Sequence, residues 1–473
     1  MTRRKIFFRA DASADIGYGH FVRTLALADM LKDQFDCTFF TQTPSDYQKA
    51  EVAKVCGLIE LPADDTKFDI FLEYLEGDEI VVLDNYFFST DYQRAIKVKG
   101  CSLVCIDDIH DKHYVADVVI NHALADSSLF SVEPYTKLCL GFDWALLRKP
   151  FLQPVNLTVR EKNHWIIAFG GSDYYNLTEK FVRLIHNYEY VHQISVVIGD
   201  AYQYESTLAG YDKLHVYKNL ASVEMCALMQ RCEYAILPCS SICIEAISQG
   251  CKVYAGYYVD NQIDVYNCLS DQGLVQGLGD LIEIHDIEIH EIKRSVDLMG
   301  FYNIPIKYCD VFNNLEKSYV SDGLVFINYA LLPEYEHKII WENRNNEAIR
   351  IHMDSPAIIL WDSHCKFVYS LKQNTQRRYW AVYHNGELIG SVNISNIEKN
   401  AVERGIFVVP SQFGRKWGTK IEHALSSLLI TMGVEIVHAK VLRTNNTSLC
   451  FHYRNGYYTA GVDDKYEYLV KSL

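Results

Sequence analysis

The chain has 473 residues and a formal net charge of −15. This surplus of acidic side chains argues against nucleic acid or an anionic membrane as the main partner, because both carry dense negative charge. Hydrophobic residues make up 49% and charged residues 22% of the chain, an ordinary globular balance, and the length suits roughly two to four domains. The polar first residues and the lack of a long apolar run predict a cytoplasmic protein without a membrane span.

The first 150 residues alternate predicted strands with predicted helices, which indicates a doubly wound parallel sheet. In such a sheet, ligands bind at the carboxyl ends of the strands. We predict strands at 5–9, 37–41, 79–84, 102–106 and 116–121, with helices at 21–31 and 47–56.

A turn containing Gly17 and Gly19 joins the first of these strands to the first helix. Glycines let the backbone approach a ligand closely, and a helix N-terminus favours a diphosphate. His20 follows at the mouth of the helix, where it is suited to act as a general base, with a structural histidine as the alternative. Asp11 would either position His20 or cap the turn. Tyr86, just beyond the third strand, would orient a water molecule or sugar hydroxyl, or simply pack.

Two prolines in residues 149–154 predict an extended linker, after which a second strand and helix series begins at 164–169. Further strands are expected at 193–198, 232–237 and 253–255, and helices run to about residue 300. Residues 306–322 are predicted to be a connector. From residue 323 the pattern changes to mostly antiparallel strands with three or four helices, including one helix over 337–353 and a hairpin around Asn385-Gly386.

The fourteen cysteines are scattered, and none form the Cys-x-x-Cys pairs that zinc knuckles use. We therefore expect reduced, buried cysteines and no metal. Asp107, Asp108, His110 and His113 follow a predicted strand, and a polar loop is favoured there over a metal site.

Residues 1 to about 300 resemble the UDP-sugar hydrolase family of the pseudaminic acid pathway, which implies two Rossmann-like halves of GT-B type. The resemblance rests on residues 9–13, 16–23, 140–141, 145–148 and 170–173, on 176–178, and on three single positions, Glu245, Asn261 and Gln262. It implies that the second half binds UDP through backbone amides after its first strand, hydroxyls at the start of a helix, and Glu245 on the ribose. The residues expected in this half are Gly171, Ser172, Asp173, Ser240, Ser241, Glu245, Asn261 and Gln262.

Residues 323 to 473 resemble the GNAT family of N-acetyltransferases, which implies acetyl-CoA as co-substrate. The matching patches are residues 341–345, Gly390, 405–408 and 414–418. The resemblance implies a strand that splays to pair with pantetheine and a helix mouth that binds the pyrophosphate. The residues expected to contact acetyl-CoA are Phe407, Val408, Val409, Gly414, Arg415, Lys416, Gly418 and Asn445.

Relatives of this family carry a tyrosine seven residues after the asparagine, and it protonates the departing thiolate. Counting from Asn445 places His452 at that position, with Tyr453 beside it. Neighbours on a helix point about 100° apart, so only one of the two can face the thiolate, and the register favours His452.

These features together predict an α/β protein with halves at 1–150 and 151–305, a connector at 306–322 and an α+β domain at 323–473. We expect a bifunctional enzyme that acetylates a UDP-4-amino-sugar and then releases UDP from the diacetamido product. Alternatives are a GT-B glycosyltransferase fused to an acetyltransferase, and a sugar-nucleotide-binding regulator. We expect the hydrolase and acetyltransferase parts to fold and work independently.

Overall fold

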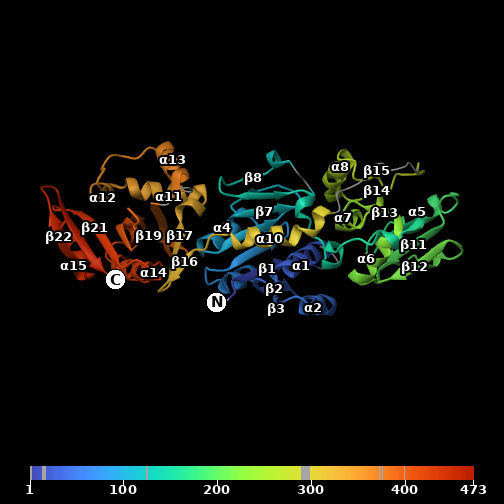
Figure 1. Ribbon diagram of the computed structural model, residues 1–473, viewed down its shortest axis with the longest axis horizontal. Coiled ribbons are helices and arrows are strands. Elements are labelled where there is room, and N and C mark those ends of the chain that lie inside the picture. Colours follow the sequence, from blue (N-terminus) through green and yellow to red (C-terminus); the bar gives the residue numbers. More distant parts are fainter. Residues whose placement is uncertain are drawn as a thin grey trace.

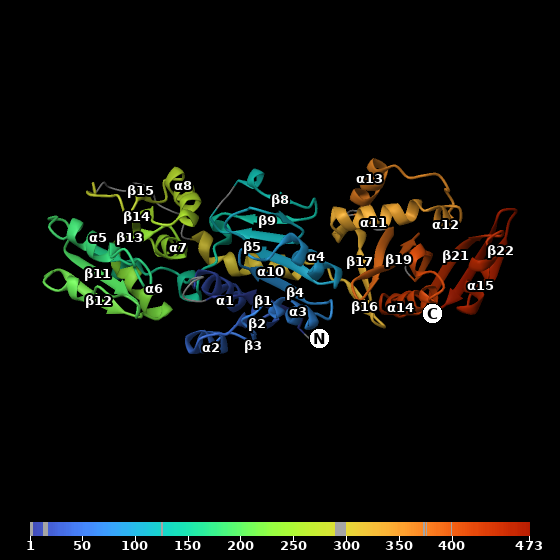
Figure 2. The same cartoon turned by 180° about the vertical axis from the view of Figure 1, so that it is seen from behind.

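The computed structural model describes residues 3–12, 18–123, 126–288, 299–371, 374, 376–398 and 400–473. Three main β-sheets follow one another along an elongated molecule, and the sheet nearest the N-terminus lies between the other two (Figures 1 and 2). Over these residues, no helix combines the length and the apolar character needed to cross a membrane.

The first sheet has seven strands in the order β3-β2-β1-β4-β5-β7-β9, and every pair is parallel. All five residues of its central strand β4 are buried, because helices cover both faces of a parallel sheet. The five strands predicted from hydrophobic runs are confirmed. The elements are β1 (Lys5–Ala10), α1 (Gly19–Leu31), β2 (Asp36–Gln42), α2 (Asp46–Ala53), β3 (Gly57–Leu61), α3 (Thr66–Glu73), β4 (Ile80–Asp84), α4 (Thr90–Val98), β5 (Ser102–Ile106), β7 (Val118–Asn121) and β9 (Lys137–Leu140), with β6 (His113–Tyr114) and β8 (Ser131–Val132) forming a separate pair.

The second sheet has six parallel strands in the order β12-β11-β10-β13-β14-β15. An apolar core runs from α1 and the first sheet into α6 and α7 of this one. The elements are β10 (Glu161–Ile167), α5 (Leu177–Ile185), β11 (Gln193–Ile198), β12 (Leu214–Lys218), α6 (Ser222–Arg231), β13 (Cys232–Pro238), α7 (Ser241–Ser248), β14 (Lys252–Tyr257), α8 (Ile263–Asp271) and β15 (Gln276–Asp280).

The segment predicted as a connector, residues 306–322, is helical over residues 306–313. Helices α9 (Met299–Tyr302) and α10 (Ile304–Asn313) return the chain to the first sheet, where Phe312 packs 6.2 Å from Phe35 between ring centroids. The buried residues of α10 are Ile304, Tyr308, Cys309, Val311 and Phe312. Their spacing of three to four residues is the pattern of a helix with one apolar face.

The C-terminal sheet has eight strands in the order β16-β17-β18-β19-β20-β21-β23-β22, and only β20 and β21 are parallel. The predicted turn at Asn385 and Gly386 is confirmed, since both have positive φ and join β18 to β19. The strands are β16 (Tyr319–Ser321), β17 (Leu324–Asn328), β18 (Arg377–His384), β19 (Glu387–Ser395), β20 (Ala401–Val408), β21 (Ile436–Leu442), β22 (Tyr458–Val462) and β23 (Tyr466–Ser472).

The helix predicted over 337–353 is wrong in its second half. Helix α11 (Glu334–Asn345) ends early, because the Asn346 side chain accepts a hydrogen bond from Ala348 N and caps the short α12 (Glu347–Arg350) instead. The other helices of this part are α13 (Trp361–Leu371), which was not predicted, α14 (Trp417–Thr431) and α15 (Asn446–Arg454).

Candidate active sites

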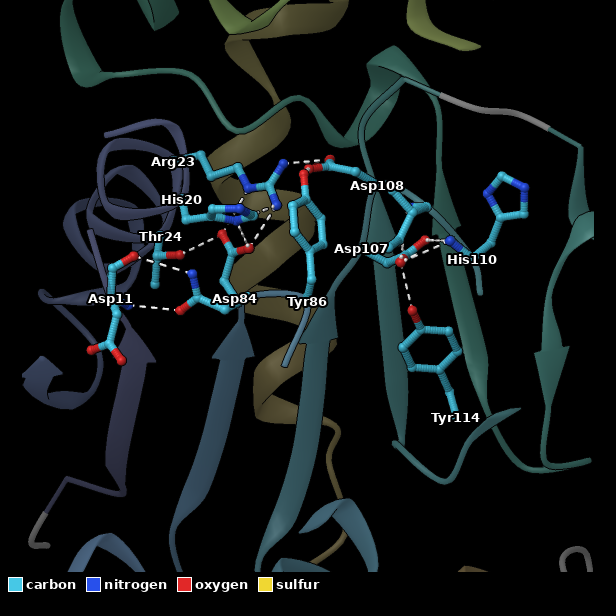
Figure 3. Close-up of polar contacts among 12 residues, drawn as sticks. Asp11, His20, Arg23, Thr24, Asp84, Tyr86, Asp107, Asp108, His110 and Tyr114 are labelled. Carbon is cyan, nitrogen blue, oxygen red and sulfur yellow. Dashed lines mark hydrogen bonds and ion pairs between the residues drawn. The ribbon is translucent and has the colours of Figure 1, made fainter. Parts of the chain in front are cut away.

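His20 and Asp84 meet at the carboxyl edge of the first sheet. His20 lies in the first turn of α1, and Asp84 is the last residue of β4. His20 Nδ1 lies 2.7 Å from Asp84 Oδ1, and both side chains are buried (Figure 3). The sequence predicted Asp84 only as the last residue of a strand and did not place it among the site residues. Its position directly after a fully apolar run, beside Asn85 and Tyr86, was the available signal.

The contact with Asp84 fixes the tautomer of His20. A carboxylate only accepts hydrogen bonds, so Nδ1 carries a hydrogen, and in the neutral imidazole Nε2 is the nitrogen with the free lone pair. Arg23 Nη2 lies 3.0 Å from the same Nδ1. A guanidinium only donates hydrogen bonds, so Arg23 cannot hydrogen-bond to an Nδ1 that carries a hydrogen. We assign the hydrogen to Nδ1 because its contact with the Asp84 carboxylate is the shorter of the two. His20 therefore presents a basic nitrogen.

Arg23 links the histidine pair to a second acidic residue. Its Nε donates to Asp84 Oδ2 over 2.7 Å, and its Nη1 pairs with Asp108. Thr24 Oγ1 also donates to Asp84 Oδ2. Burial alone would raise the pKa of Asp84, but Arg23 and His20 hold it below the ordinary value. Asp84 is consequently an anion that orients His20.

Tyr86 completes the cluster and connects it to the second sheet. Its ring stands edge-on to His20 with centroids 4.7 Å apart, and its hydroxyl donates to Asp108 Oδ2 over 3.1 Å (Figure 3). The side chain of Asn261, which lies between β14 and α8, is near enough to Tyr86 to lower the pKa of its hydroxyl. Burial and Asp108 raise the pKa of Tyr86 to about 12, so it stays a neutral donor. Residues from two sheets thus converge near His20.

Asp11 does not position His20 as one reading of the sequence expected. Its carboxylate pairs with Arg9 and accepts from Gln42 N, and it points away from His20 in Figure 3. Asn85, which directly follows β4, accepts a hydrogen bond from Asp11 N through its Oδ1 and donates one to Asp11 O through its Nδ2. Gly17 lies outside the described residues, and Gly19 is the exposed first residue of α1.

His122 also borders the cluster and was missed in the sequence. It is buried, and Leu146 N donates to its Nδ1 over 3.3 Å. Burial and the positive charge of Arg23 lower its pKa to about 4, so it is neutral at physiological pH.

Three of the four residues weighed as metal ligands, Asp107, Asp108 and His113, are bound by other side chains of the protein. Asp107 accepts from the backbone N–H of His110 and from the Tyr114 hydroxyl, whereas Asp108 faces Arg23. His113 contacts Ser131 and Glu133. The four do not converge on one point.

The loop after β10 is only partly available for a phosphate. Gly170, Gly171 and Ser172 are exposed, and Gly170 has a φ of +87°. Asp173 is buried, and its carboxylate accepts from Leu177 N and Thr178 N at the start of α5. Asp173 is therefore a helix cap, and the open donors of this loop precede it.

Glu245, expected on a ribose, is engaged by the protein. Arg148 donates to both of its carboxylate oxygens, each over 2.7 Å. Gln262 accepts from Tyr258 N and is buried. Ser240 and Ser241 lie half-buried where β13 leads into α7.

The second candidate site lies where β20 and β21 separate. Their pairing ends at Glu403 and His438, although β20 continues to Val408 and β21 to Leu442. Residues Phe407 and Val408 therefore present one strand edge that β21 does not cover. This is the splayed strand that the sequence led us to expect.

The loop expected at the pyrophosphate leads into α14. Gly414 and Lys416 have φ values of +77° and +61°, and Arg415 and Lys416 are exposed. Gly418 packs against the ring of Phe451, which a Cβ would approach to 3.3 Å. Val409 is buried.

His452 and Tyr453 point in different directions from α15. Tyr453 is exposed, and its hydroxyl contacts Thr459 and Glu467. His452 is buried, and its Nδ1 lies 2.6 Å from the carbonyl oxygen of Ser448, so Nδ1 carries the hydrogen. Burial and Arg404 lower its pKa to about 4. Asn445 caps α15 by accepting from Ser448 N.

Comparison with known proteins agrees with this division. Residues 341–457 match the model of the acetyltransferase (GNAT) family. The C-terminal domain is a GNAT domain. The "Acetyltransferase PseH" of Campylobacter jejuni is 26% identical over 144 residues, which cover 30% of this chain and 89% of that protein.

Two further relatives extend beyond the GNAT domain. The UDP-2,4-diacetamido-2,4,6-trideoxy-beta-L-altropyranose hydrolase of Campylobacter jejuni is 26% identical over 281 residues, covering 57% of this chain and 97% of its own length. Uncharacterized protein MJ1062 of Methanocaldococcus jannaschii is 26% identical over 475 residues, covering 94% of this chain and 95% of its own length. The chain thus joins a segment homologous to a UDP-sugar hydrolase with a GNAT domain.

Proposed function

We propose that this chain is a bifunctional enzyme of nonulosonic acid synthesis. The GNAT domain acetylates the 4-amino group of a UDP-4-amino-sugar, and the two parallel-sheet halves then hydrolyse the resulting UDP-2,4-diacetamido-2,4,6-trideoxyhexose. The support is the similarity to a hydrolase acting on such a sugar and to a GNAT acetyltransferase. The two halves, 1–150 and 151–305, would enclose the sugar nucleotide in a GT-B arrangement, with the acetyltransferase at 323–473.

The observation that carries the hydrolase assignment is the meeting of His20, Tyr86 and Asn261 from two sheets. In hydrolysis a water oxygen attacks the anomeric carbon, the carbon–oxygen bond to the β-phosphate breaks, and UDP leaves with the electron pair. His20 Nε2 takes the proton of the water, and Asp84 stabilises the imidazolium that forms. Tyr86, a neutral donor, and Asn261 orient the water or a sugar hydroxyl.

The UDP moiety would lie along the edge of the second sheet. Backbone amides of Gly171 and Ser172, with Ser240 and Ser241 at the start of α7, supply donors for the diphosphate. The ion pair of Arg148 and Glu245 implies a cost for the predicted ribose contact, because both carboxylate oxygens already accept hydrogen bonds. Glu245 retains lone pairs for a hydroxyl, since each carboxylate oxygen can accept twice.

In the GNAT domain, acetyl-CoA is the co-substrate. Its pantetheine arm would pair with the uncovered edge of β20 at Phe407 and Val408, and its pyrophosphate would meet the loop of Gly414, Arg415 and Lys416. The amine nitrogen attacks the thioester carbon and loses a proton, the carbon–sulfur bond breaks, and the thiolate takes up a proton as coenzyme A leaves.

One assay separates this proposal from its rivals. The protein is incubated with acetyl-CoA and UDP-2-acetamido-4-amino-2,4,6-trideoxyhexose, and both free thiol and UDP are followed without any sugar acceptor. We expect thiol release first and UDP release second. UDP release that requires an acceptor would indicate a glycosyltransferase, and binding without turnover would indicate a regulator. Either result would overturn the proposal.

A further inference from the structure

Helix α11 of the GNAT domain begins without a cap from its own sequence. Its N-cap residue is Pro333, which provides no side-chain hydrogen bond. The first amides of a helix have no partners within the helix, so a polar group must come from elsewhere or from water.

The domain built on the seven-stranded sheet, which we call the first parallel-sheet domain, supplies this polar group. Both carboxylate oxygens of Glu133 accept from Glu334 N, the first residue of α11, over 3.1 and 3.2 Å. Glu133 is only 5% exposed, and backbone hydrogen bonds from Glu133 N to Tyr114 O and from Thr136 N to Glu133 O hold its own segment. A negative charge at a helix N-terminus also interacts favourably with the helix dipole. The cap is therefore rigid and comes from some 200 residues upstream.

A second residue of the same domain holds the next position of α11. The guanidinium of Arg94, on α4, lies over the ring of Tyr335 at 5.2 Å. Burial raises the pKa of Glu336, and Arg94 partly offsets this. Glu336 is in turn tied to the sheet, because it accepts from the Tyr383 hydroxyl over 2.7 Å. The first two residues of α11 thus contact the first domain, and the third is tied to the GNAT sheet.

The docking behind this contact is close. A Cβ on Gly100 would lie 2.5 Å from Val325 Cγ1 of β17. Arg4 donates to Leu315 O over 2.7 Å, and Ser102 Oγ donates to Glu316 O over 2.9 Å. Both ribbon views show α4 beside β17 (Figures 1 and 2). This close packing does not favour the expectation that the hydrolase and acetyltransferase parts fold and work independently.

Helix α11 covers the face of the GNAT sheet on which the splayed strand presents Phe407. Phe407 is directly opposite Ser391 of β19, so both side chains lie on one face. Ser391 hydrogen-bonds to Tyr329 over 2.7 Å, and Tyr329 packs in one apolar cluster with Ile340 of α11. The position of α11 consequently shapes the space from which an amine reaches the thioester.

We propose that the first parallel-sheet domain positions the acceptor side of the acetyltransferase, with Glu133 as the positioning residue. This inference rests on the proposed acetyltransferase function. Glu133 has no contact with His20 among the described residues. It precedes β9 and so lies toward the amino edge of the parallel sheet, whereas His20 lies at the carboxyl edge. Its role therefore concerns acetyl transfer and not UDP release.

The test compares Glu133→Ala, Glu133→Gln and the full-length parent with acetyl-CoA and the UDP-4-amino-sugar. We expect Glu133→Ala to raise KM for the amino sugar roughly threefold to tenfold, the scale of losing a helix cap. Glu133→Gln still has one side-chain oxygen that accepts a hydrogen bond, so its KM should lie between those of the parent and Glu133→Ala. The Kd for acetyl-CoA and UDP release from supplied diacetamido sugar stay unchanged.

A rescue distinguishes the cap from general docking. Pro333→Ser gives α11 its own N-cap, because Pro333 already has the extended backbone of a capping residue. In the Glu133→Ala background, we expect Pro333→Ser to lower the raised KM most of the way back to the parent value. Lys317→Ala, which removes an exposed ion pair with Asp78 at the same domain contact, is the matched control and should change nothing.

Hydrogen exchange of the backbone amides tests the helix cap without an activity assay. Glu133→Ala should speed exchange of the amides of the first turn of α11, and the added Pro333→Ser should slow it again. An unchanged KM and unchanged exchange in Glu133→Ala would overturn the inference, as would equal effects of Lys317→Ala. If the parent protein fails to acetylate the amino sugar while exchange responds as expected, the proposed function fails and the cap stands.

Discussion

Asp84 holds His20 from the end of a different element, with Oδ1 2.7 Å from Nδ1. This contact leaves Nε2 as the basic nitrogen of the cluster, and Arg23 and Thr24 fix the other side of the carboxylate. The pair gives the first prediction.

His20→Ala should lower the rate of UDP release roughly 10²–10⁴-fold, the scale of a lost general base. Asp84→Asn should also slow release, because an amide no longer enforces the tautomer. Acetyl transfer by the GNAT domain should continue, so the UDP-linked diacetamido product accumulates. Thr24→Val removes one hydrogen bond to the same carboxylate without touching His20, and it is the control. Near-normal UDP release in His20→Ala would disprove the assignment of the base.

Tyr86 and Asn261 join the two parallel-sheet domains, so their effects on UDP release should not be additive. We expect Tyr86→Phe and Asn261→Ala to slow release singly, and the double variant to be slowed by less than the product of the two factors. The measurement is a double-mutant cycle on kcat/KM. Strictly multiplicative effects would mean that the two side chains act separately.

His452 is arranged to accept a proton and not to supply one. Its Nδ1–H faces the Ser448 carbonyl, and its pKa is lowered to about 4. We expect His452→Phe to slow acetyl transfer roughly 10²–10⁴-fold and Tyr453→Phe to have little effect. The parent rate should rise with pH through about 4 and then level, as expected for a base. A rate that falls above that pH would restore the acid role predicted from register.

Lys416 combines a positive charge with a left-handed backbone. A lysine at positive φ costs roughly 1–2 kcal/mol, which asparagine reduces. Lys416→Asn should therefore slightly raise stability while weakening acetyl-CoA binding, since the charge next to the pyrophosphate is lost. Lys420→Asn, on an exposed helix position nearby, is the comparison. Calorimetric titration with acetyl-CoA and thermal unfolding test the two effects, and unchanged affinity would show that this charge does not meet the pyrophosphate.

Four buried histidines make the fold sensitive to mild acid. Burial lowers the pKa of His122, His337, His364 and His452 to about 4. An unfolded histidine titrates near 6.5, so the unfolded state binds more protons between these values and the free energy of unfolding falls as pH drops from 6.5 to 4. Each contributes on the order of 1 kcal/mol or more. His364→Asn should flatten this dependence in urea unfolding between pH 7 and 4.5, and an unchanged slope would contradict it.

The sequence by itself determined the layers of this protein. Apolar runs such as that of β4 have a length and pattern typical of a strand buried on both faces, and the Asn385-Gly386 pair specifies its turn through local backbone preference. The glycine-rich turns and the motifs of both parts are local in the chain, so they were visible without coordinates.

The tertiary structure decided which side chains share a contact. His20 is paired with Asp84 and not Asp11, because β4 lies next to β1 and its end faces α1. The Arg148 and Glu245 pair, the Asn261 contact with Tyr86 and the capping of α11 by Glu133 each join residues far apart in sequence. Such partners depend on strand order and domain docking, which are set by burial summed over the whole chain and leave no mark at the individual residues.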